Sequence, residues 1–281
     1  MKLYSRAKIN LFLDIVGQDP LDGYHYIDSL FQEITLCDVI DMNKASEDIV
    51  EFEPDSELNK NSTVHKALKL FKERFGIKTC YSIKVKKNIP IGSGLGGGSS
   101  NAATVLRFLA KEYRVPFDDL LEIAKNIGSD VPFFLYGGLC RVSGKGELVR
   151  KLSHKLKNVY FLIICPDIFI STKEAYSLIK DKNSVLTFPD LENISLITID
   201  FLKKIVYNKF QKIIFNNFSS LGILYENLKK HLKAEIIFMS GSGSSLVAVY
   251  DNRLKRMKDF LYLKRQKCFK VFMAKPFYSV S

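Results

Sequence analysis

The chain has 281 residues, of which 47% are hydrophobic and 26% are charged. These values exclude an intrinsically disordered chain, a collagen and a coiled coil, and the length favours two domains. Lysine and arginine outnumber aspartate and glutamate by 42 to 30, which gives a net charge of +12. Such a charge favours a polyanionic partner, which could be a nucleic acid, a membrane or a nucleotide.

The patterns of cysteine, histidine and hydropathy argue against disulfide-rich, zinc-binding and membrane-spanning proteins. The 5 cysteines are widely spaced and form no CxxC pair, and the 4 histidines lack metal-ligand spacing, so neither a disulfide framework nor a zinc site is predicted. Asp14 interrupts the apolar run near the N-terminus, and residues 159–165 are too short a run to span a membrane. The densest basic stretch, residues 253–275, is interleaved with apolar residues, which favours a solvated face over a nucleic-acid surface. We therefore expect a soluble, cytoplasmic protein that binds neither nucleic acid nor membrane.

The first half of the chain alternates between strand and helix patterns. Period-two alternation of apolar residues predicts strands, and apolar residues at helical spacing predict helices. A helix at 63–75 is expected to begin after Ser62 and to end at Gly76. The other expected elements are strands at 7–16, 27–41, 49–52, 81–88 and 138–142, helices at 101–113 and 117–126, and a turn at 144–146.

The pattern restarts after His154 with a buried strand. A β-α-β order with late antiparallel signals predicts a second α+β layer. We expect an N-terminal domain at 1–153 and a C-terminal domain at 154–281. The expected elements are strands at 159–166, 235–239, 246–251 and 271–275, a helix at 173–179, a polar linker through 193, helices within 200–215 and 221–232, a loop at 240–245 and a basic helix after 251.

Five glycines in seven positions, from Gly92 to Gly98, follow a predicted strand and precede a predicted helix. Glycine permits positive φ angles and close approach of a ligand to the backbone. The first N–H groups of the helix and the positive end of its dipole would then face the loop, which suits phosphate groups. Ser99 and Ser100 add hydroxyls suited to phosphate oxygens or Mg²⁺. The pattern predicts a nucleotide-phosphate site.

Other glycine loops fit less well. A P-loop requires a lysine directly after its last glycine, where this chain has Ser99. Gly92, Gly94 and Gly97 match the GxGxxG of Rossmann dehydrogenases, but another helix and the segment SDVPFF follow where that fold needs a parallel strand. A protein kinase would carry HRD and DFG motifs, which are absent. A glycine-rich turn without a ligand is the remaining alternative.

The segment IPIGSGLGGGSSNAA closely resembles the phosphate-loop signature of the GHMP kinases, which phosphorylate small molecules. AKINLFL at 7–13, DGYHYIDSLFQ at 22–32, GSDVPFF at 128–134 and MSGSGSSLVAVY at 239–250 resemble the branch of this family that acts on 4-diphosphocytidyl-2-C-methyl-D-erythritol. The resemblance implies a two-domain α+β fold: a nucleotide-binding domain with a left-handed β-α-β phosphate loop, and a ferredoxin-like substrate domain. It also implies ATP and Mg²⁺. As partners we expect only the small-molecule substrate, with the protein a monomer or weak homodimer.

The resemblance further implies roles for individual residues. Asp130, which local pattern alone favours as a helix N-cap, would be the catalytic base. Lys8, which alternation alone favours as an outward strand lysine, would point at Asp130 and the transferred phosphoryl group. Tyr24 would stack on cytosine, His25 would hydrogen-bond the edge of the base and Tyr176 would cover its other face, although the preceding Asp-Gly pair also predicts a simple turn.

The remaining implied contacts are less direct. Asn10 and Thr172 would contact the substrate's sugar or polar tail, and Ser100 is the candidate Mg²⁺ ligand if the ion is not bound through the ATP phosphates alone. Two departures from the family pattern are Ser240, in place of threonine, and Leu21, an added loop residue. Alternative functions are another GHMP kinase, such as homoserine or mevalonate kinase, and a nucleotide-responsive nucleic-acid binder. The implied ATP site comprises Asn61, Lys87, Pro90, Gly92, Gly94, Leu95, Gly96, Gly97, Gly98, Ser99 and Ser100.

Overall fold

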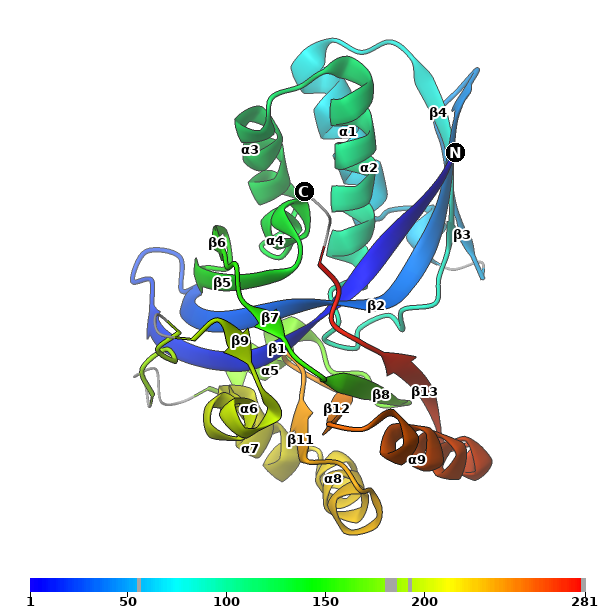
Figure 1. Cartoon of the computed structure of the whole chain (residues 1–281). Helices are drawn as coiled ribbons and strands as arrows, with labels where there is room; N and C mark the ends of the chain where they lie inside the picture. Colours follow the sequence, from blue (N-terminus) through cyan, green and yellow to red (C-terminus); the bar gives the residue numbers. More distant parts are fainter. Residues whose placement is uncertain (55–56, 180–185, 192–193, 279–281) are drawn as a thin grey trace.

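Two long antiparallel strands, β1 (Lys2–Gln18) and β2 (His25–Ala45), form the centre of the structure, a computed structural model that describes residues 1–54, 57–179, 186–191 and 194–278. The two strands pair from Lys2 opposite Asp41 to Gln18 opposite His25. Both predicted strands are confirmed, and both extend beyond the expected ends. Helices α1–α4 lie above this pair in Figure 1, and α6–α9 lie below it. β1 is therefore covered on both faces, and its residues 7–15 are all buried.

The first sheet gains five further strands around this pair. They include a β-α-β unit in which β3 and β4 are parallel neighbours and α1 connects them. β10 comes from the second half of the chain, yet it pairs in parallel with β1. These strands are β3 (Ile49–Glu53), β4 (Cys80–Lys86), β5 (Leu139–Gly144), β6 (Leu148–Lys151) and β10 (Tyr207–Asn208).

Four helices pack against the upper face of this sheet. They are α1 (Thr63–Phe75), α2 (Gly97–Tyr113), α3 (Phe117–Ile127) and α4 (Val131–Tyr136). The predicted caps of α1 are confirmed: the Ser62 side chain accepts a hydrogen bond from the backbone N–H of His65, and Gly76 ends the helix with φ of 65°. α2 begins at Gly97, four residues before the expected start, and α4 begins directly after Asp130, where the local pattern predicts a helix start.

The second sheet has the strand order β11-β12-β8-β13, with every neighbouring pair antiparallel. Helices lie between β8 and β11 and between β12 and β13, which gives the β-α-β-β-α-β order of a ferredoxin-like unit. The expected ferredoxin-like C-terminal region is thus confirmed. Its strands are β8 (Tyr160–Pro166), β11 (Ile236–Met239), β12 (Leu246–Tyr250) and β13 (Phe269–Ala274).

The helical content of the second half differs in detail from the prediction. The region expected to hold helices within 200–215 is divided by β10 into α6 (Ile199–Ile205) and α7 (Lys209–Asn217). The expected polar linker lies partly outside the described residues. The domain division at residue 153 stays a prediction. The remaining elements are a 3₁₀ helix (Glu57–Asn59), β7 (Lys155–Leu156), α5 (Thr172–Ser177), β9 (Leu196–Ile197), α8 (Ser219–His231) and α9 (Arg253–Gln266).

Residues 275–278 run alongside β2 and connect the two halves of the chain. The backbone N–H of Phe277 donates to the carbonyl of Glu33 at 2.9 Å. The Tyr278 hydroxyl donates to Gln32 Oε1 at 3.1 Å and accepts from the backbone N–H of Leu156 at 2.7 Å. This segment, the C-terminal strap, therefore touches β2 and the start of the second half at once.

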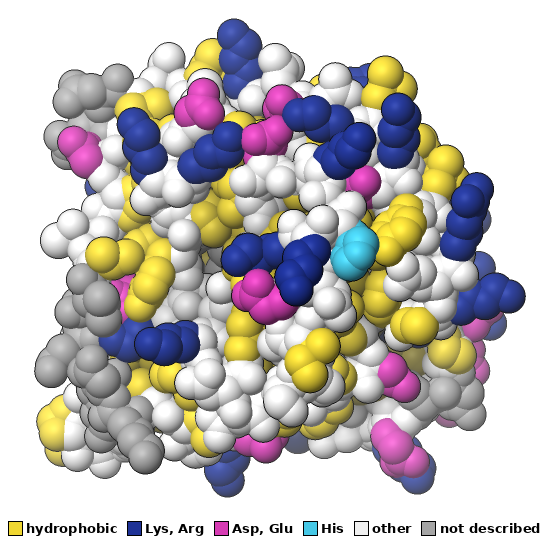
Figure 2. Space-filling model, turned by 90° about the horizontal axis from the view of Figure 1, so that it is seen from below, with side chains coloured by type: hydrophobic (Ala, Val, Ile, Leu, Met, Phe, Trp, Pro, Cys, Tyr) yellow, Lys and Arg dark blue, Asp and Glu magenta, His cyan; other side chains and the backbone are white. Residues whose placement is uncertain are grey.

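Lys and Arg side chains on the lower face of the molecule are interspersed with acidic, hydrophobic and uncharged ones (Figure 2). Lys255 of α9, for example, forms ion pairs with Glu235 at 2.9 Å and Asp251 at 3.1 Å. Across the described residues, none of the helices combines the length and apolar character needed to cross a membrane.

Candidate active site

A cavity of about 520 Å³ opens between the glycine loop, the start of α4 and two loops of the second half. Most residues assigned to the site by resemblance line it. Those that do not are Asn61, Ser100, Tyr24 and His25. The predicted residues lining the cavity are Lys8, Asn10, Lys87, Pro90, Gly92, Gly94, Leu95, Gly96, Gly97, Gly98, Ser99, Asp130, Thr172 and Tyr176.

The glycine loop has a backbone that only glycine adopts readily. Gly92, Gly94 and Gly96 have φ of 64°, 74° and 70°. A Cβ atom on Gly94 would also lie 2.3 Å from the carbonyl oxygen of Ser240. Gly97 and Gly98 are instead the first residues of α2, so the positive φ expected of the loop does not extend to them. The first N–H groups of α2, which have no partners within the helix, therefore lie at the cavity, as an anion site requires.

The loop at 240–245 supports the glycine loop from the second half. The Ser240 hydroxyl donates to the carbonyl of Gly94 at 3.3 Å, and the backbone N–H of Ser245 donates to the carbonyl of Ser93 at 3.3 Å. Serine at position 240 thus supplies the hydroxyl that threonine would supply. The cavity depends on contacts between both halves of the chain.

Lys8 and Asp130 meet inside the cavity. Lys8 Nζ lies 3.4 Å from Asp130 Oδ2, donates to Asn10 Oδ1 at 2.7 Å and lies 4.3 Å from the centre of the Phe31 ring. The Lys8 side chain is 5% exposed, so the alternative of an outward strand lysine is wrong. Asp130 stands at the N-cap position of α4, but its side chain makes no capping hydrogen bond. Among the described residues that line the cavity, Asp130 is the one carboxylate, and no capping bond withholds it from a ligand.

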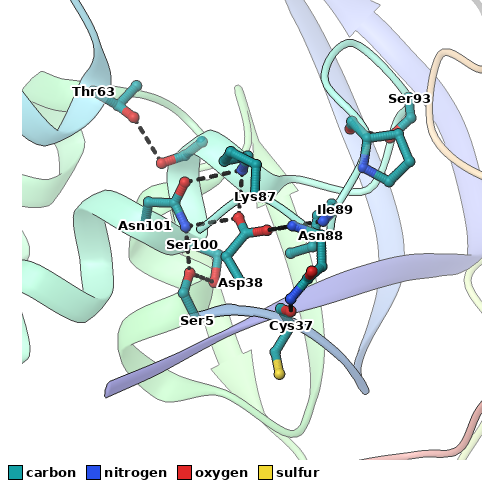
Figure 3. Close-up of polar contacts among 12 residues, drawn as sticks. Ser5, Cys37, Asp38, Thr63, Lys87, Asn88, Ile89, Ser93, Ser100 and Asn101 are labelled. Atoms are coloured by element: carbon teal, nitrogen blue, oxygen red, sulfur yellow. Dashed lines mark hydrogen bonds and ion pairs between the residues drawn. The ribbon is translucent and has the colours of Figure 1, made fainter. Parts of the chain in front are cut away.

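Lys87 reaches the cavity from the end of β4 and is held by buried partners (Figure 3). Its ammonium group forms an ion pair with Asp38 and donates to Asn101 Oδ1 at 3.0 Å. Ser100 lies in the same network, 2% exposed, where its hydroxyl accepts from Ser5 at 2.8 Å. Of the two adjacent serines, Ser99 lines the cavity and Ser100 does not.

The protein itself offers few side chains that could bind a metal ion near the cavity. Among the described residues no group of three His, Cys, Asp or Glu side chains could hold a metal ion. Asn61 is exposed and outside the cavity wall, although its neighbours Ser62 and Thr63 line it. The assignments of Ser100 to Mg²⁺ and of Asn61 to adenine stay predictions.

The residues expected to hold cytosine lie at the edge of the cavity. Tyr24 is 63% exposed, and its backbone N–H donates to Asp22 Oδ1 at 3.0 Å, so the predicted local turn is present. The His25 and Tyr176 rings contact each other directly, with centroids 5.1 Å apart. Burial and the charge of Asp130 raise the pKa of the Tyr176 phenol. His25 thus lies beside Tyr176, and the placement of cytosine between Tyr24 and Tyr176, with His25 at the edge of the base, stays a prediction.

Sequence reasoning missed Lys145, which lines the cavity beside this turn. Its ammonium lies 2.7 Å from Asp19 Oδ2, 2.5 Å from Asp22 Oδ2 and 5.7 Å from the centre of the Tyr24 ring. Hydrogen bonds from Lys145, from the backbone of Leu21 and from Tyr26 lower the pKa of Asp19 to about 2. The signal in the sequence was a lysine between the two glycines of a predicted turn. Phe169 and Ser242 were also missed, because loop positions carry no periodic signal.

Comparison with known proteins agrees with this geometry. Residues 62–138 match the N-terminal domain of the GHMP kinases. The 4-diphosphocytidyl-2-C-methyl-D-erythritol kinase of Thermotoga maritima is 36% identical over 254 residues, which covers 89% of this chain and 92% of that protein. The enzyme of the same name from Clostridium tetani is 37% identical over 275 residues, covering 90% and 92%. The chain belongs to the 4-diphosphocytidyl-2-C-methyl-D-erythritol kinase family.

Solved structures support the same family. A crystal structure of a 4-(cytidine 5'-diphospho)-2C-methyl-D-erythritol kinase has a TM-score of 0.82 at 26% identity and covers 98% of each chain. Homoserine kinase from Cytophaga hutchinsonii has a TM-score of 0.70 at 17% identity, with 98% of this chain and 94% of that chain covered, and so shares the fold. The chain is a small-molecule kinase with the GHMP fold, and the motif resemblance is confirmed. The Rossmann alternative is wrong.

Proposed function

We propose that this kinase transfers the γ-phosphoryl group of ATP to the 2-hydroxyl of 4-diphosphocytidyl-2-C-methyl-D-erythritol, giving the 2-phosphate and ADP for isoprenoid synthesis. The observation that carries the proposal is the ion pair between Lys8 and Asp130, 3.4 Å apart, in a cavity formed by the family's glycine loop. Phosphoryl transfer depends on positioning and charge stabilisation more than on covalent chemistry by the protein. The site offers both.

The glycine loop and α2 would hold the ATP phosphates. Gly94 fits this role because its backbone has no room for a side chain, and the N-terminus of α2 supplies N–H donors. The cavity wall carries two oxygen groups that could coordinate Mg²⁺, the Ser99 hydroxyl and the Asp130 carboxylate. Mg²⁺ prefers oxygen ligands and binds chiefly through substrate phosphates. When bound, Mg²⁺ would neutralise charge on the phosphates.

Asp130 and Lys8 would act on the acceptor. Asp130 would orient the 2-hydroxyl and accept its proton, and the Lys8 ammonium would stabilise negative charge on the phosphoryl group in transit. Asn10 holds Lys8 in place, because its amide oxygen accepts from Nζ and its amide nitrogen donates to Ser29 Oγ at 3.1 Å. The Lys8 ammonium is therefore preorganised by buried hydrogen bonds.

The cytidine would bind at the edge of the cavity. The exposed ring of Tyr24 offers a face for the base, with His25, Tyr176 and Thr172 as further contacts. We also propose that residues 1–153 bind ATP and residues 154–281 bind part of the substrate, since the glycine loop belongs to the first segment and Thr172 and Tyr176 belong to the second. The proposed form is a cytoplasmic monomer or weak homodimer without a nucleic-acid or membrane partner.

A substrate panel tests this function. The protein is incubated with Mg-ATP and, separately, 4-diphosphocytidyl-2-C-methyl-D-erythritol, CDP-glycerol, homoserine or mevalonate. ADP release with the first compound alone is the expected result. Release with homoserine or mevalonate would assign the chain to another GHMP activity, and a salt-sensitive affinity for RNA or DNA would support the nucleic-acid alternative.

A further inference from the structure

Asp38 is a completely buried carboxylate on β2 that has no part in the mechanism above. Figure 3 shows it at the centre of a network that joins β2, the end of β4 and the first turns of α2. Burial of a carboxylate is costly unless hydrogen bonds and an opposite charge compensate for it. Both oxygens of Asp38 are fully used, so its contacts indicate what the carboxylate positions.

The first oxygen fixes the backbone that leads into the glycine loop. Asp38 Oδ1 accepts from the backbone N–H groups of Asn88 at 2.7 Å and Ile89 at 2.8 Å. These residues lie between Lys87 and Pro90, both of which line the cavity. The path of the chain from β4 into the loop therefore depends on this carboxylate.

The second oxygen holds the cation of the cavity wall. Asp38 Oδ2 pairs with Lys87 Nζ and accepts from Asn101 Nδ2 at 2.9 Å. Lys87 Nζ also donates to Asn101 Oδ1 at 3.0 Å. An ammonium group has three donors; within the described part of the chain two of them have partners, which leaves the third for a ligand. Lys87 Nζ lies close to the start of α2, since a Cβ on Gly97 would be 3.2 Å from it.

We propose that Asp38 is a positioning residue for nucleotide binding: it holds the Lys87 ammonium and the start of the glycine loop in the geometry that receives ATP. The identity of the ligand as ATP rests on the proposed function. Asp38 itself is fully buried and does not line the cavity. It acts through Lys87 and through the backbone of Asn88 and Ile89.

The test is Asp38→Asn, which keeps the size of the side chain and one oxygen for the two backbone donors. Its amide nitrogen would face the donors on Lys87 and Asn101, so the ammonium loses its carboxylate. We expect the Kd for the Mg²⁺ complex of adenylyl imidodiphosphate, measured by calorimetry without acceptor, to rise about 10- to 100-fold, as loss of a charged hydrogen bond implies. The KM for ATP should rise similarly, and kcat at saturating ATP should change less than threefold.

The matched control is Asp41→Asn, three residues further along β2 and outside the cavity wall, which should leave the Kd unchanged. In a Lys87→Gln background, Asp38→Asn should weaken binding by less than threefold more, because the partner is already lost. A purely structural role would lower the melting temperature and leave the Kd of the folded protein alone.

Other outcomes overturn the proposal. A Kd for Asp38→Asn within twofold of the parent does so, and so does an equally large effect in the Lys87→Gln background. If circular dichroism shows Asp38→Asn to be unfolded, Asn101→Ala decides instead: at least threefold weaker binding supports the proposal and unchanged binding overturns it. A parent that binds the nucleotide but does not phosphorylate the cytidine substrate overturns the proposed function alone; a parent that binds no nucleotide overturns both.

Discussion

Replacing Asp130 with alanine separates a catalytic role from a structural one. Loss of a general base costs about 10²- to 10⁴-fold in rate, which corresponds to about 2.7–5.4 kcal/mol of transition-state stabilisation at about 1.36 kcal/mol per decade. We expect kcat to fall by this factor. The affinity for ATP should stay within twofold, because the carboxylate is proposed to touch the acceptor hydroxyl.

The stability of the same variant tests the alternative, in which Asp130 is only a helix N-cap. Loss of a true N-cap costs about 0.5–2 kcal/mol, and each kcal/mol shifts the melting temperature of a protein of this size by about 2–4 °C. Asp130 makes no capping hydrogen bond, and Lys8 keeps its bond to Asn10 at 2.7 Å when the carboxylate is gone. The melting temperature should therefore change by less than about 2 °C.

The assay couples ADP release to NADH oxidation and is run beside differential scanning fluorimetry on one preparation. Asp130→Asn, which keeps the shape and removes the base, should match Asp130→Ala in rate. Asp118→Ala is the control, because Asp118 is an exposed acid near the start of α3, outside the cavity wall. A variant that keeps kcat within threefold but melts several degrees lower would refute the catalytic role and restore the capping interpretation.

Three further results are expected. Gly97→Val should weaken ATP binding, since a Cβ there lies 3.2 Å from Lys87 Nζ, and unchanged affinity in a calorimetric titration would contradict the phosphate site. Tyr24→Ala should lower kcat/KM for the cytidine substrate about 5- to 150-fold, by analogy with stacking energies of about 1–3 kcal/mol per base. Tyr24→Phe should change kcat/KM little, because the ring face is kept. An equal loss of kcat/KM for ATP in Tyr24→Ala would contradict stacking of Tyr24 on cytosine. Burial raises the pKa of the Cys140 thiol to about 12, so a disulfide reagent at pH 8 should label exposed Cys268 and leave Cys140 unlabelled until the protein unfolds. Because the unfolded thiol ionises at lower pH than the folded one, this group should also favour unfolding as pH rises above about 8.5.

Much of the fold follows from local patterns. Alternation located β1 and β2, and the Ser62 and Gly76 caps located α1, because caps are set by neighbouring residues. The start of α2 was expected four residues late, since glycine and serine are poor helix formers and only the tertiary setting of the loop makes Gly97 helical. β10 has two residues, too few for any periodic signal, and its pairing with β1 is set by the fold.

The candidate site also combines features that local sequence predicts with features that depend on distant residues. The glycine loop could be predicted because backbone positions with positive φ favour glycine, which is visible in the sequence. The burial of Asp38 was predictable in principle, since it stands between Leu36 and Ile40 on the inward face of a strand, where a carboxylate signals a buried network. The partners of Asp38 were not, because Lys87 and Asn101 are brought to it from distant parts of the sequence.

The C-terminal strap has a consequence for how the chain reaches its native state. Tyr278 bonds to Gln32 across 246 residues of sequence, and β10 reaches β1 from the other half of the chain. Contacts of such long range close large loops, and proteins dominated by them fold slowly. Until the strap docks on β2 near Glu33 and β10 docks on β1, these backbone segments stay open to pairing with another chain. Folding of this kinase should therefore be most exposed to aggregation before residues 275–278 and β10 are in place, and residues 1–153 expressed alone should associate rather than remain monomeric.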